Sequence, residues 1–404
     1  MNKSEELVYK LCTKSFLSLW SYPTPQGKGK KELCDVLVVC EPDIIIFSVK
    51  EIAFKDTGNP EVDFQRWHRK AVEESCEQIY GAERWISLNP NVITEKGEIS
   101  LPFPNLVNRR IHRIAVALGS KGKAPFFFGD FGKGFIHVLN EKSLDVLLNE
   151  LDTISDFVKY LTDKEDFYRS GKTTLLTGGE EDFLAFYLSN NREFPSEINT
   201  LVLEDDLWSG LSSDSQYLEK KKLDEISYIW DELIEELYQT YLDSNLISDL
   251  PYTSDNLLDI EKAIRVMARE TRLARRMLAI SLVDFLQSAK GKKLKSRVSE
   301  GNISEVLYVF QISKYENDRK YNMAELAGRC VVARGICQNK KIVIGINVEF
   351  SDFVKGSATT VCYLEIPEWT KEWQEQMDYL QKEFGYFIKP NAKRLQEQEY
   401  PPKN

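Results

Sequence analysis

The sequence has few of the features that mark the commonest membrane and metal-binding classes. It contains no run of about 18 apolar residues, the length that a membrane-spanning helix requires. Only three histidines occur, and there is neither a CxxC pair nor an HExxH pattern. A structural zinc site or a zinc-protease centre is therefore not indicated. The N-terminus runs directly into a polar helical pattern and lacks the apolar segment of a signal peptide.

Cysteines are present but unpaired in their spacing. There are seven, and several lie inside apolar, strand-like runs. An odd and dispersed set is typical of buried free thiols in a reducing compartment. We therefore expect a cytoplasmic protein.

The overall composition allows a large core but restricts the class of partner. At 404 residues, of which 42% are hydrophobic, the chain is long enough for two or three domains. The net charge of −10 argues against a general nucleic-acid coat protein. A local basic groove is still compatible with that charge.

One short stretch carries most of the functional information. Two apolar runs, Leu33–Cys40 and Ile44–Lys50, are joined by a turn around Pro42. Runs of this kind, rich in Val and Ile, predict a β-hairpin. The hairpin brings Asp35 and Lys50 almost opposite each other, with Cβ atoms about 5 Å apart. A metal-binding carboxylate beside a lysine that holds an attacking water would explain such a pair on core strands.

The hairpin belongs to a predicted α/β domain that covers residues 1–162. The order of elements there is α-β-β-α-β-β-β-α, which indicates a mixed sheet flanked by helices. Helices are expected at residues 4–20, 63–86 and 141–161, and further strands at 111–118, 125–128 and 134–139.

Two further regions and a tail follow. We predict a mainly helical domain at 163–300, a smaller C-terminal α/β region at 301–390 and a polar tail at 391–404. The expected helices of these regions are 224–242, 261–290 and 368–384, and the expected strands are 305–312, 342–348 and 359–365.

The helical domain changes from acidic to basic along the chain. Lys and Arg greatly outnumber Asp and Glu between residues 261 and 297. Four arginines follow i, i+4, i+7, i+11 spacing and so share one face of the predicted helix: Arg265, Arg269, Arg272 and Arg276. This face is a candidate for contacts to nucleic-acid phosphates. The alternative is that it pairs with the acidic segment before it.

Two short patterns look like known motifs but lack the required context. Ser170 to Thr173 reads SGKT, yet the glycine of a phosphate-binding loop is replaced by Asp166. Asp130-Phe131-Gly132 is similar to a kinase signature, but neither an HRD motif nor a glycine-rich loop accompanies it. We expect a Gly/Phe turn at that position.

The first 90 residues or so resemble the PD-(D/E)xK, or restriction-endonuclease-like, nuclease superfamily. The resemblance rests on Asp35, on the Ser48-Val49-Lys50 triplet in the next strand, and on an acidic first helix. It implies an αβββαβ core in which carboxylates bind Mg²⁺ or Mn²⁺. It also implies that the lysine orients or activates the water that cuts a phosphodiester.

The resemblance assigns roles to individual residues. Asp35 matches the first metal carboxylate and Lys50 matches the lysine. Glu6, or its neighbour Glu5, matches the first-helix acid that some branches use as a further metal ligand. Ser48 departs from the pattern, because the superfamily has Asp or Glu there.

An acid from the following helix can replace the missing one, as in some restriction enzymes with Ser-x-Lys. The candidates are Glu73, Glu74 and Glu77, of which Glu74 is our choice as a metal ligand. Gln78 lies four residues later on the same helix face, so both side chains are positioned to reach the hairpin. We count Gln78 and Ser48 with the candidate catalytic residues.

Three functions follow from this reading. The first is a metal-dependent nuclease, acting on DNA, with restriction or anti-phage defence as the setting by analogy. The second is a nuclease-fold protein that no longer cuts but binds nucleic acid or scaffolds a complex. The third is a protein-interaction scaffold that uses the acidic middle region. A protein partner or a homo-oligomer is compatible with each.

Overall fold

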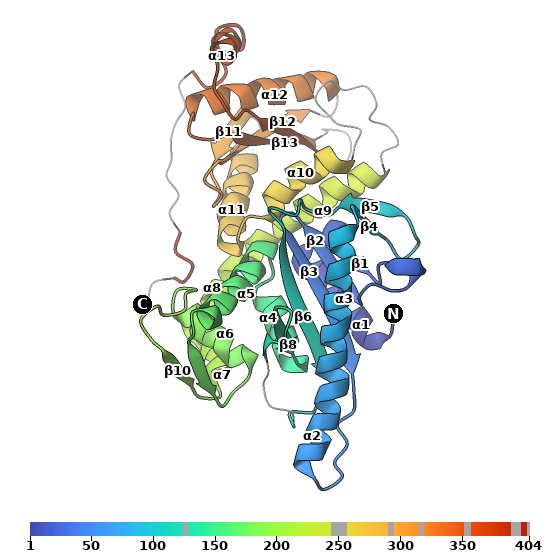
Figure 1. Ribbon diagram of the computed structural model, residues 1–404. Helices are drawn as coiled ribbons and strands as arrows, with labels where there is room; N and C mark the ends of the chain where they lie inside the picture. Colours follow the sequence, from blue (N-terminus) through green and yellow to red (C-terminus); the bar gives the residue numbers. More distant parts are fainter. Residues whose placement is uncertain are drawn as a thin grey trace. The chain divides into compact units, whose positions relative to one another are not determined.

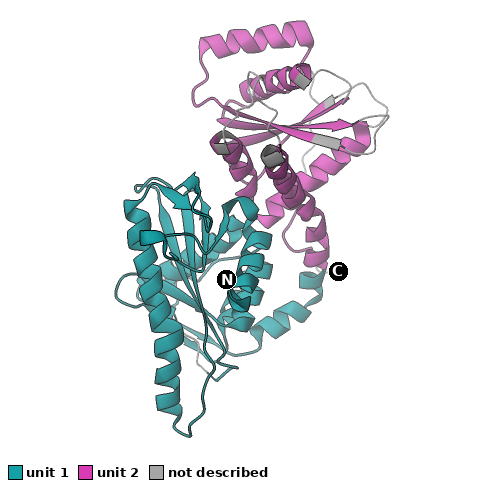
Figure 2. Ribbon diagram, turned by 90° about the vertical axis from the view of Figure 1, so that its right-hand side faces the viewer, with its two compact units in different colours: residues 1–218 teal, residues 219–404 magenta. Residues whose placement is uncertain are grey.

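The computed structural model describes residues 1–123, 128–243, 257–289, 295–314, 319–350, 357–388 and 397–401. The fold is mixed α/β, with 50% helix and 23% strand, which confirms the expected class. Contacts divide the chain into two compact units, Met1–Leu218 and Glu219–Asn404 (Figure 2). The expected domain boundaries near 162 and 300 therefore each fall inside a unit. No helix of the described ranges is both long and apolar enough to cross a membrane.

Unit 1 is built on a six-stranded mixed sheet with the order β1-β2-β3-β6-β8-β7 (Figure 1). Its strands are β1 (Ser21–Pro23), β2 (Val36–Cys40), β3 (Asp43–Glu51), β6 (Arg110–Leu118), β7 (Phe128–Asp130) and β8 (Phe135–Leu139). The pairs β1–β2, β2–β3 and β7–β8 are antiparallel. The pairs β3–β6 and β6–β8 are parallel. Parallel pairing requires a crossover, which the helix between β3 and β6 supplies.

The predicted hairpin is confirmed, with a small shift of register. Cys40 pairs with Asp43, so the turn has two residues, and Val36 pairs with Phe47. Continuing this register puts Asp35 opposite Ser48. Lys50 lies two positions further along β3, on the same face as Ser48. The expectation that Asp35 and Lys50 oppose each other is corrected by this offset, which arises because the turn is tighter than assumed.

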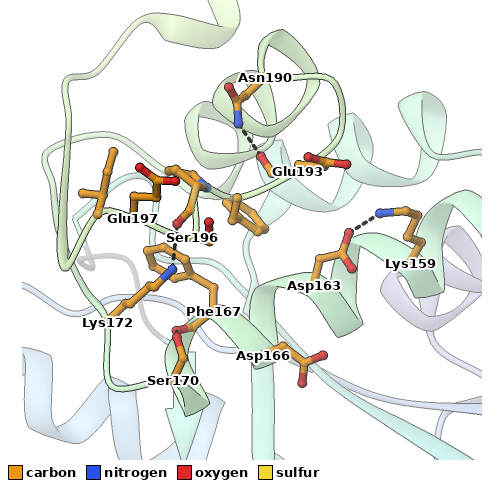
Figure 3. Close-up of a pocket in the computed structure, with 13 residues that line it drawn as sticks. Lys159, Asp163, Asp166, Phe167, Ser170, Lys172, Asn190, Glu193, Ser196 and Glu197 are labelled. Atoms are coloured by element: carbon orange, nitrogen blue, oxygen red, sulfur yellow. Dashed lines mark hydrogen bonds and ion pairs between the residues drawn. The ribbon is translucent and has the colours of Figure 1, made fainter.

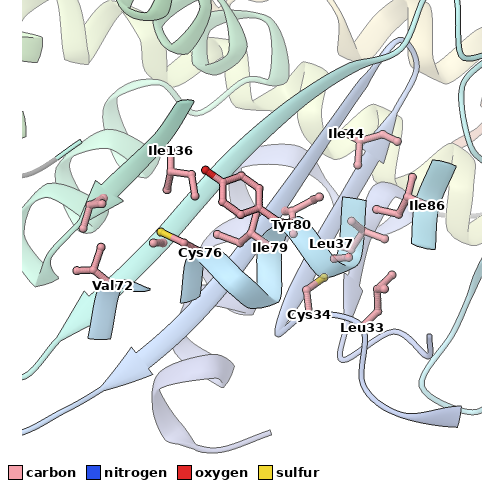
Figure 4. Packing of buried hydrophobic residues seen from close by; sticks show 14 of the residues in the cluster. Leu33, Cys34, Leu37, Ile44, Val72, Cys76, Ile79, Tyr80, Ile86 and Ile136 are labelled. Carbon is pink, nitrogen blue, oxygen red and sulfur yellow. The ribbon is translucent and has the colours of Figure 1, made fainter. Parts of the chain in front are cut away.

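Helices cover both faces of the sheet. On one face lie α2 (Pro60–His68), a π-helical turn (Arg69–Glu73) and α3 (Glu74–Leu88), which pack on a cluster of buried apolar residues (Figure 4). On the other lie α1 (Lys3–Phe16) and α4 (Glu141–Glu150) (Figure 1). The predicted helix 141–161 is two helices, because Thr153 caps a new one, α5 (Ile154–Arg169).

The remainder of unit 1 was not predicted in detail. It contains two small two-stranded sheets, one from β4 (Asn91–Ile93) and β5 (Ile99–Pro102), the other from β9 (Thr173–Leu176) and β10 (Thr200–Leu203). The helices α6 (Glu180–Ser189), α7 (Leu207–Ser213) and the start of α8 (Ser215–Asp224) complete it. The SGKT sequence lies at the beginning of β9 rather than in a phosphate-binding loop.

Unit 2 has a four-stranded sheet with the order β11-β12-β13-β14. Its strands are β11 (Lys295–Ser299), β12 (Val306–Lys314), β13 (Ile342–Phe350) and β14 (Ser357–Glu365). The strands β12 and β13 are parallel and are connected by α12 (Arg319–Ile336), a helix that the sequence reading missed. The other helices are α9 (Tyr228–Asp243), α10 (Leu257–Ala268), α11 (Arg272–Ala289) and α13 (Lys371–Phe384).

Ionisable groups are buried on the α4 side of the first sheet. Nε2 of His112 lies 2.9 Å from Oδ1 of Asp43, and Nε2 of His137 lies 3.2 Å from Oε1 of Glu165. His137 is fully buried, and this burial lowers its pKa from 6.5 to about 4. The positive charge of Lys164 contributes in the same direction.

We expect the protein to lose stability on acidification through this histidine. Between pH 6.5 and pH 4 the unfolded chain binds a proton on His137 that the folded chain does not. The free energy of unfolding must therefore fall as the pH drops through this window. Thermal unfolding across the window should show a weaker pH dependence for His137→Gln than for the unsubstituted protein. An equal dependence would show that His137 is protonated in the folded state.

A second prediction concerns two glycines with opposite surroundings. Gly119 follows β6 with a φ of +90°, and a Cβ there would lie 2.4 Å from the carbonyl oxygen of Ile52. Gly119→Ala should destabilise the fold by at least about 2 kcal/mol. Gly81, inside α3, has no atom near the place of its Cβ, so Gly81→Ala should stabilise by about 1 kcal/mol. Chemical denaturation of both variants measures the difference, and the same sign for both would contradict it.

Candidate active site

Asp35 is fixed at the open end of the β2–β3 hairpin. Its backbone N–H donates to the carbonyl of Phe47 (3.2 Å), which continues the ladder by one residue. Its Oδ2 accepts a hydrogen bond from the backbone N–H of Val49 (2.6 Å). The residue is only 2% exposed. The carboxylate is thus held against β3 by a main-chain donor, which fixes its direction.

Two polar residues of β3 lie on the face that α3 covers. Ser48 is fully buried, and its hydroxyl donates to Oε1 of Gln78 (2.6 Å). Lys50 is two residues further and partly exposed. Gln78 therefore reaches the hairpin, as its helical spacing suggested. This hydrogen bond joins α3 to β3.

A second carboxyl group does approach Asp35, but it comes from Glu32. This residue precedes β2, and its carboxyl group lies close enough to that of Asp35 for the two to interact. Loss of hydration, the interaction with Asp35, and the negative charges of Asp35 and Glu5 raise the pKa of Glu32 to about 7. The ammonium group of Lys50 acts in the opposite direction. One electrostatic cluster therefore contains four side chains, those of Glu5, Glu32, Asp35 and Lys50.

Sequence reasoning missed Glu32 because it searched the next strand and the next helix. Glu32 lies before β2 begins and forms an isolated antiparallel β-bridge with Gln26. A signal was present in its spacing, since Glu32 stands three residues before Asp35 in the same segment. That spacing alone does not predict how the segment before β2 folds, so it does not predict the contact.

The other predicted acids are placed differently. Glu5 caps α1, where its carboxylate accepts from the backbone N–H of Asn2 (2.8 Å), and it lies at the edge of the cluster. Glu6 instead pairs with Lys10 (2.6 Å) with about half of its side chain exposed, so the structure does not bring it to Asp35. Glu74 is exposed at the start of α3 and makes no described contact with the hairpin.

The donor set suits some metals and not others. Within the described ranges, no group of three or more His, Cys, Asp and Glu side chains is arranged to hold a metal. A zinc cage would need about four such ligands. Mg²⁺ commonly uses one or two carboxylates and keeps its waters for substrate phosphates. The pair of Glu32 and Asp35 matches that sparser requirement, because two adjacent carboxylates repel until a cation separates them.

The expected arginine face is corrected by the structure. The helix is interrupted after α10, and Arg269 lies in the break before α11. Arg265 pairs with Glu261 (3.6 Å) within α10. Arg272 and Arg276 are 4% and 0% exposed, so they face the interior and not solvent.

The buried arginines neutralise the acidic segment that precedes them. Arg272 pairs with Asp231 (2.8 Å), and Arg275 pairs with the same carboxylate. Arg276 pairs with Asp224 (3.1 Å). The alternative that the sequence left open, pairing with the acidic segment, is what unit 2 adopts. These side chains stabilise the fold and present no surface to a phosphate backbone.

Removing the shared carboxylate should therefore weaken unit 2. Asp231→Ala leaves two guanidinium groups buried without their counterion, which costs roughly 3–5 kcal/mol of unfolding free energy. Glu232→Ala is the matched control, because Glu232 is the next residue and its side chain is exposed. Chemical denaturation of both variants measures the effect. Equal stability of the two variants would contradict the burial of these ion pairs.

One cavity of unit 1 is separate from the cluster of Glu32, Asp35 and Lys50. It has a volume of about 800 Å³ and lies between α5 and the segment 190–198 (Figure 3). Lys159 pairs there with Asp163, and Lys172 donates to the carbonyl of Pro195 (2.7 Å). Its two lysines are thus occupied within the protein. We assign no chemistry to this cavity.

Comparison with known proteins adds no assignment. No protein-family model matches the chain, and no curated protein or solved structure is significantly similar to it. The function is therefore argued from the geometry around Asp35.

Proposed function

We propose that this protein is a metal-dependent nuclease that hydrolyses phosphodiester bonds, with DNA as its substrate. The observation that carries the proposal is the position of Asp35 on the hairpin, held by the Val49 amide two residues from the register position of Lys50, with the carboxyl group of Glu32 interacting with it. The order of elements supports it. In unit 1, α1, β1, β2, β3, α3 and β6 occur in this order, with α2 before α3 and the small β4–β5 sheet between α3 and β6, and β3 runs parallel to β6. This order is compatible with the αβββαβ core that the resemblance to the PD-(D/E)xK superfamily implies.

Each residue of the cluster has a distinct role in this proposal. Glu32 and Asp35 would hold Mg²⁺ or Mn²⁺, which would offset charge on the phosphate and acidify a bound water. Lys50 would donate a hydrogen bond to the attacking water or to a phosphate oxygen. Glu74, four residues before Gln78 on α3, has an exposed side chain. Ser48 and Gln78 bind each other, so they position α3 against the hairpin.

The second candidate is a nuclease-fold protein that binds nucleic acid without cutting it. A specific observation favours it: Ser48 is buried and its hydroxyl is used by Gln78, so the usual second acid is lost. Such a protein would bind DNA without a divalent cation. The two candidates therefore differ in their metal requirement.

The setting that we propose is restriction or anti-phage defence in the cytoplasm, by analogy with the superfamily. All seven cysteines are free thiols, and six are buried, which supports a reducing compartment. A protein partner or a second copy of the chain is compatible with the proposal.

Cleavage assays on DNA and RNA with Mg²⁺ or Mn²⁺ test the proposal. Asp35→Asn, Glu32→Gln and Lys50→Ala should each lower the rate by about a hundredfold or more. Glu6→Gln is the matched control, because Glu6 lies on the exposed face of α1, and it should keep full activity. Cleavage that survives in the three variants, or in a chelator, would overturn the assignment. DNA binding without metal and without cleavage would support the second candidate instead.

A further inference from the structure

A second, basic pocket lies at the other end of the same sheet. It has a volume of about 500 Å³, within the range of small-molecule sites. Its walls come from α3, from the loop before β6, from β6 itself and from the turn between β7 and β8. Four cationic side chains line it, Arg84, Arg109, Arg113 and Lys133, with a single carboxylate, Glu83. The pocket is therefore strongly positive in a chain whose net charge is −10.

Two of these cations are committed to the protein. Arg113 makes a bidentate pair with Glu83, with both N···O distances at 2.7 Å. Arg109 donates to the carbonyl oxygens of Pro104 (2.7 and 2.9 Å) and Ile86 (3.2 Å). The guanidinium of Arg109 is thus fixed in place, while its charge is not offset by a carboxylate.

The other two cations are available to a ligand. Arg84 and Lys133 are exposed, and neither has a carboxylate partner among the described residues. Nζ of Lys133 lies 5.8 Å from the centre of the Tyr80 ring. Arg84 is four residues after Tyr80 on α3, so both cations flank the same side of the helix.

The turn that carries Lys133 is built to hold it there. The Asp130 carboxylate accepts from the backbone N–H groups of Gly132 (2.7 Å) and Gly134 (3.0 Å). The Tyr80 hydroxyl donates to the carbonyl of Gly134 (2.8 Å), which ties the turn to α3. The Asp-Phe-Gly sequence therefore forms the expected turn, and its structural role is to place a lysine at the pocket.

We infer that this pocket binds the phosphate group of a nucleotide. Arg84 and Lys133 would contact the phosphate, with the fixed charge of Arg109 behind them, because guanidinium and ammonium groups bind phosphate strongly. Leu106, which is 65% exposed, and Ile111 supply an apolar wall for the base or sugar. Inorganic phosphate alone would leave this wall and most of the volume unused.

The pocket is distinct from the candidate active site. Lys50 pairs with Ala117 near the end of β6, whereas Ile111 pairs with Ile44 near its start. At about 3.3 Å per residue, the pocket and Lys50 are roughly 20 Å apart along the strand. The inference does not depend on cleavage of nucleic acid. The ligand is either a free mononucleotide or the phosphorylated end of a nucleic-acid strand.

Binding to this pocket is measured by calorimetric titration of the full chain carrying Asp35→Asn. A chelator is present, so the candidate active site does not contribute to binding through a metal. The probes are adenosine monophosphate, and an oligonucleotide with or without a 5′-phosphate. Arg84→Ala and Lys133→Ala should each weaken binding about tenfold. Lys96→Glu, a charge change at an exposed position outside the pocket, is the matched control and should leave binding unchanged.

The outcomes distinguish a free mononucleotide from a phosphorylated strand end, and they also show whether the pocket binds no nucleotide. Binding of the mononucleotide supports a free ligand. Binding of the oligonucleotide only when it is phosphorylated supports a strand end. The inference is overturned if neither probe binds, or if Arg84→Ala and Lys133→Ala bind as tightly as Lys96→Glu.

Discussion

The burial of the β2–β3 hairpin on both faces is the constraint on which unit 1 depends. Every residue of β2 and the first seven residues of β3 are buried. Strands of this kind need a layer of helices on each side. α1 and α4 supply one layer, and α2 and α3 supply the other. On the hairpin, the acids Asp35 and Asp43 and the lysine Lys50 therefore lie at or just beyond the strand ends.

This confinement explains why the acids gather where they do. Asp35 is the last residue before β2 becomes wholly apolar, and its carboxylate is held by the amide of Val49. Glu32 approaches it from the segment outside the sheet, so the two carboxyl groups meet at the edge of the core. Lys50 lies where β3 leaves the core. The cluster therefore forms where strand ends meet, with Glu5 of α1 at its edge and without an acid from α3.

The hairpin and most of the longer strands were predictable because their signals are local. A run of Val and Ile ended by a Pro-Asp turn has few other structures open to it. The contact of Glu32 with Asp35 was not predictable, because it depends on how a loop returns to the sheet. The register shift at Lys50 had a similar origin, since a turn one residue shorter moves every pair. Helix α12 was missed because no element was predicted for residues 319–336.

The arginines of α10 and α11 show a second limit of prediction from sequence, which concerns exposure and not element type. Spacing of i, i+4, i+7 predicts that side chains share a helix face, but it does not say whether that face meets water or protein. Arg272 and Arg276 meet the carboxylates of Asp231 and Asp224 inside unit 2. A cluster of positive charge becomes a binding surface only where carboxylates are missing around it. That condition is met by Arg84 and Lys133, which came from two separate segments and formed no pattern in the sequence.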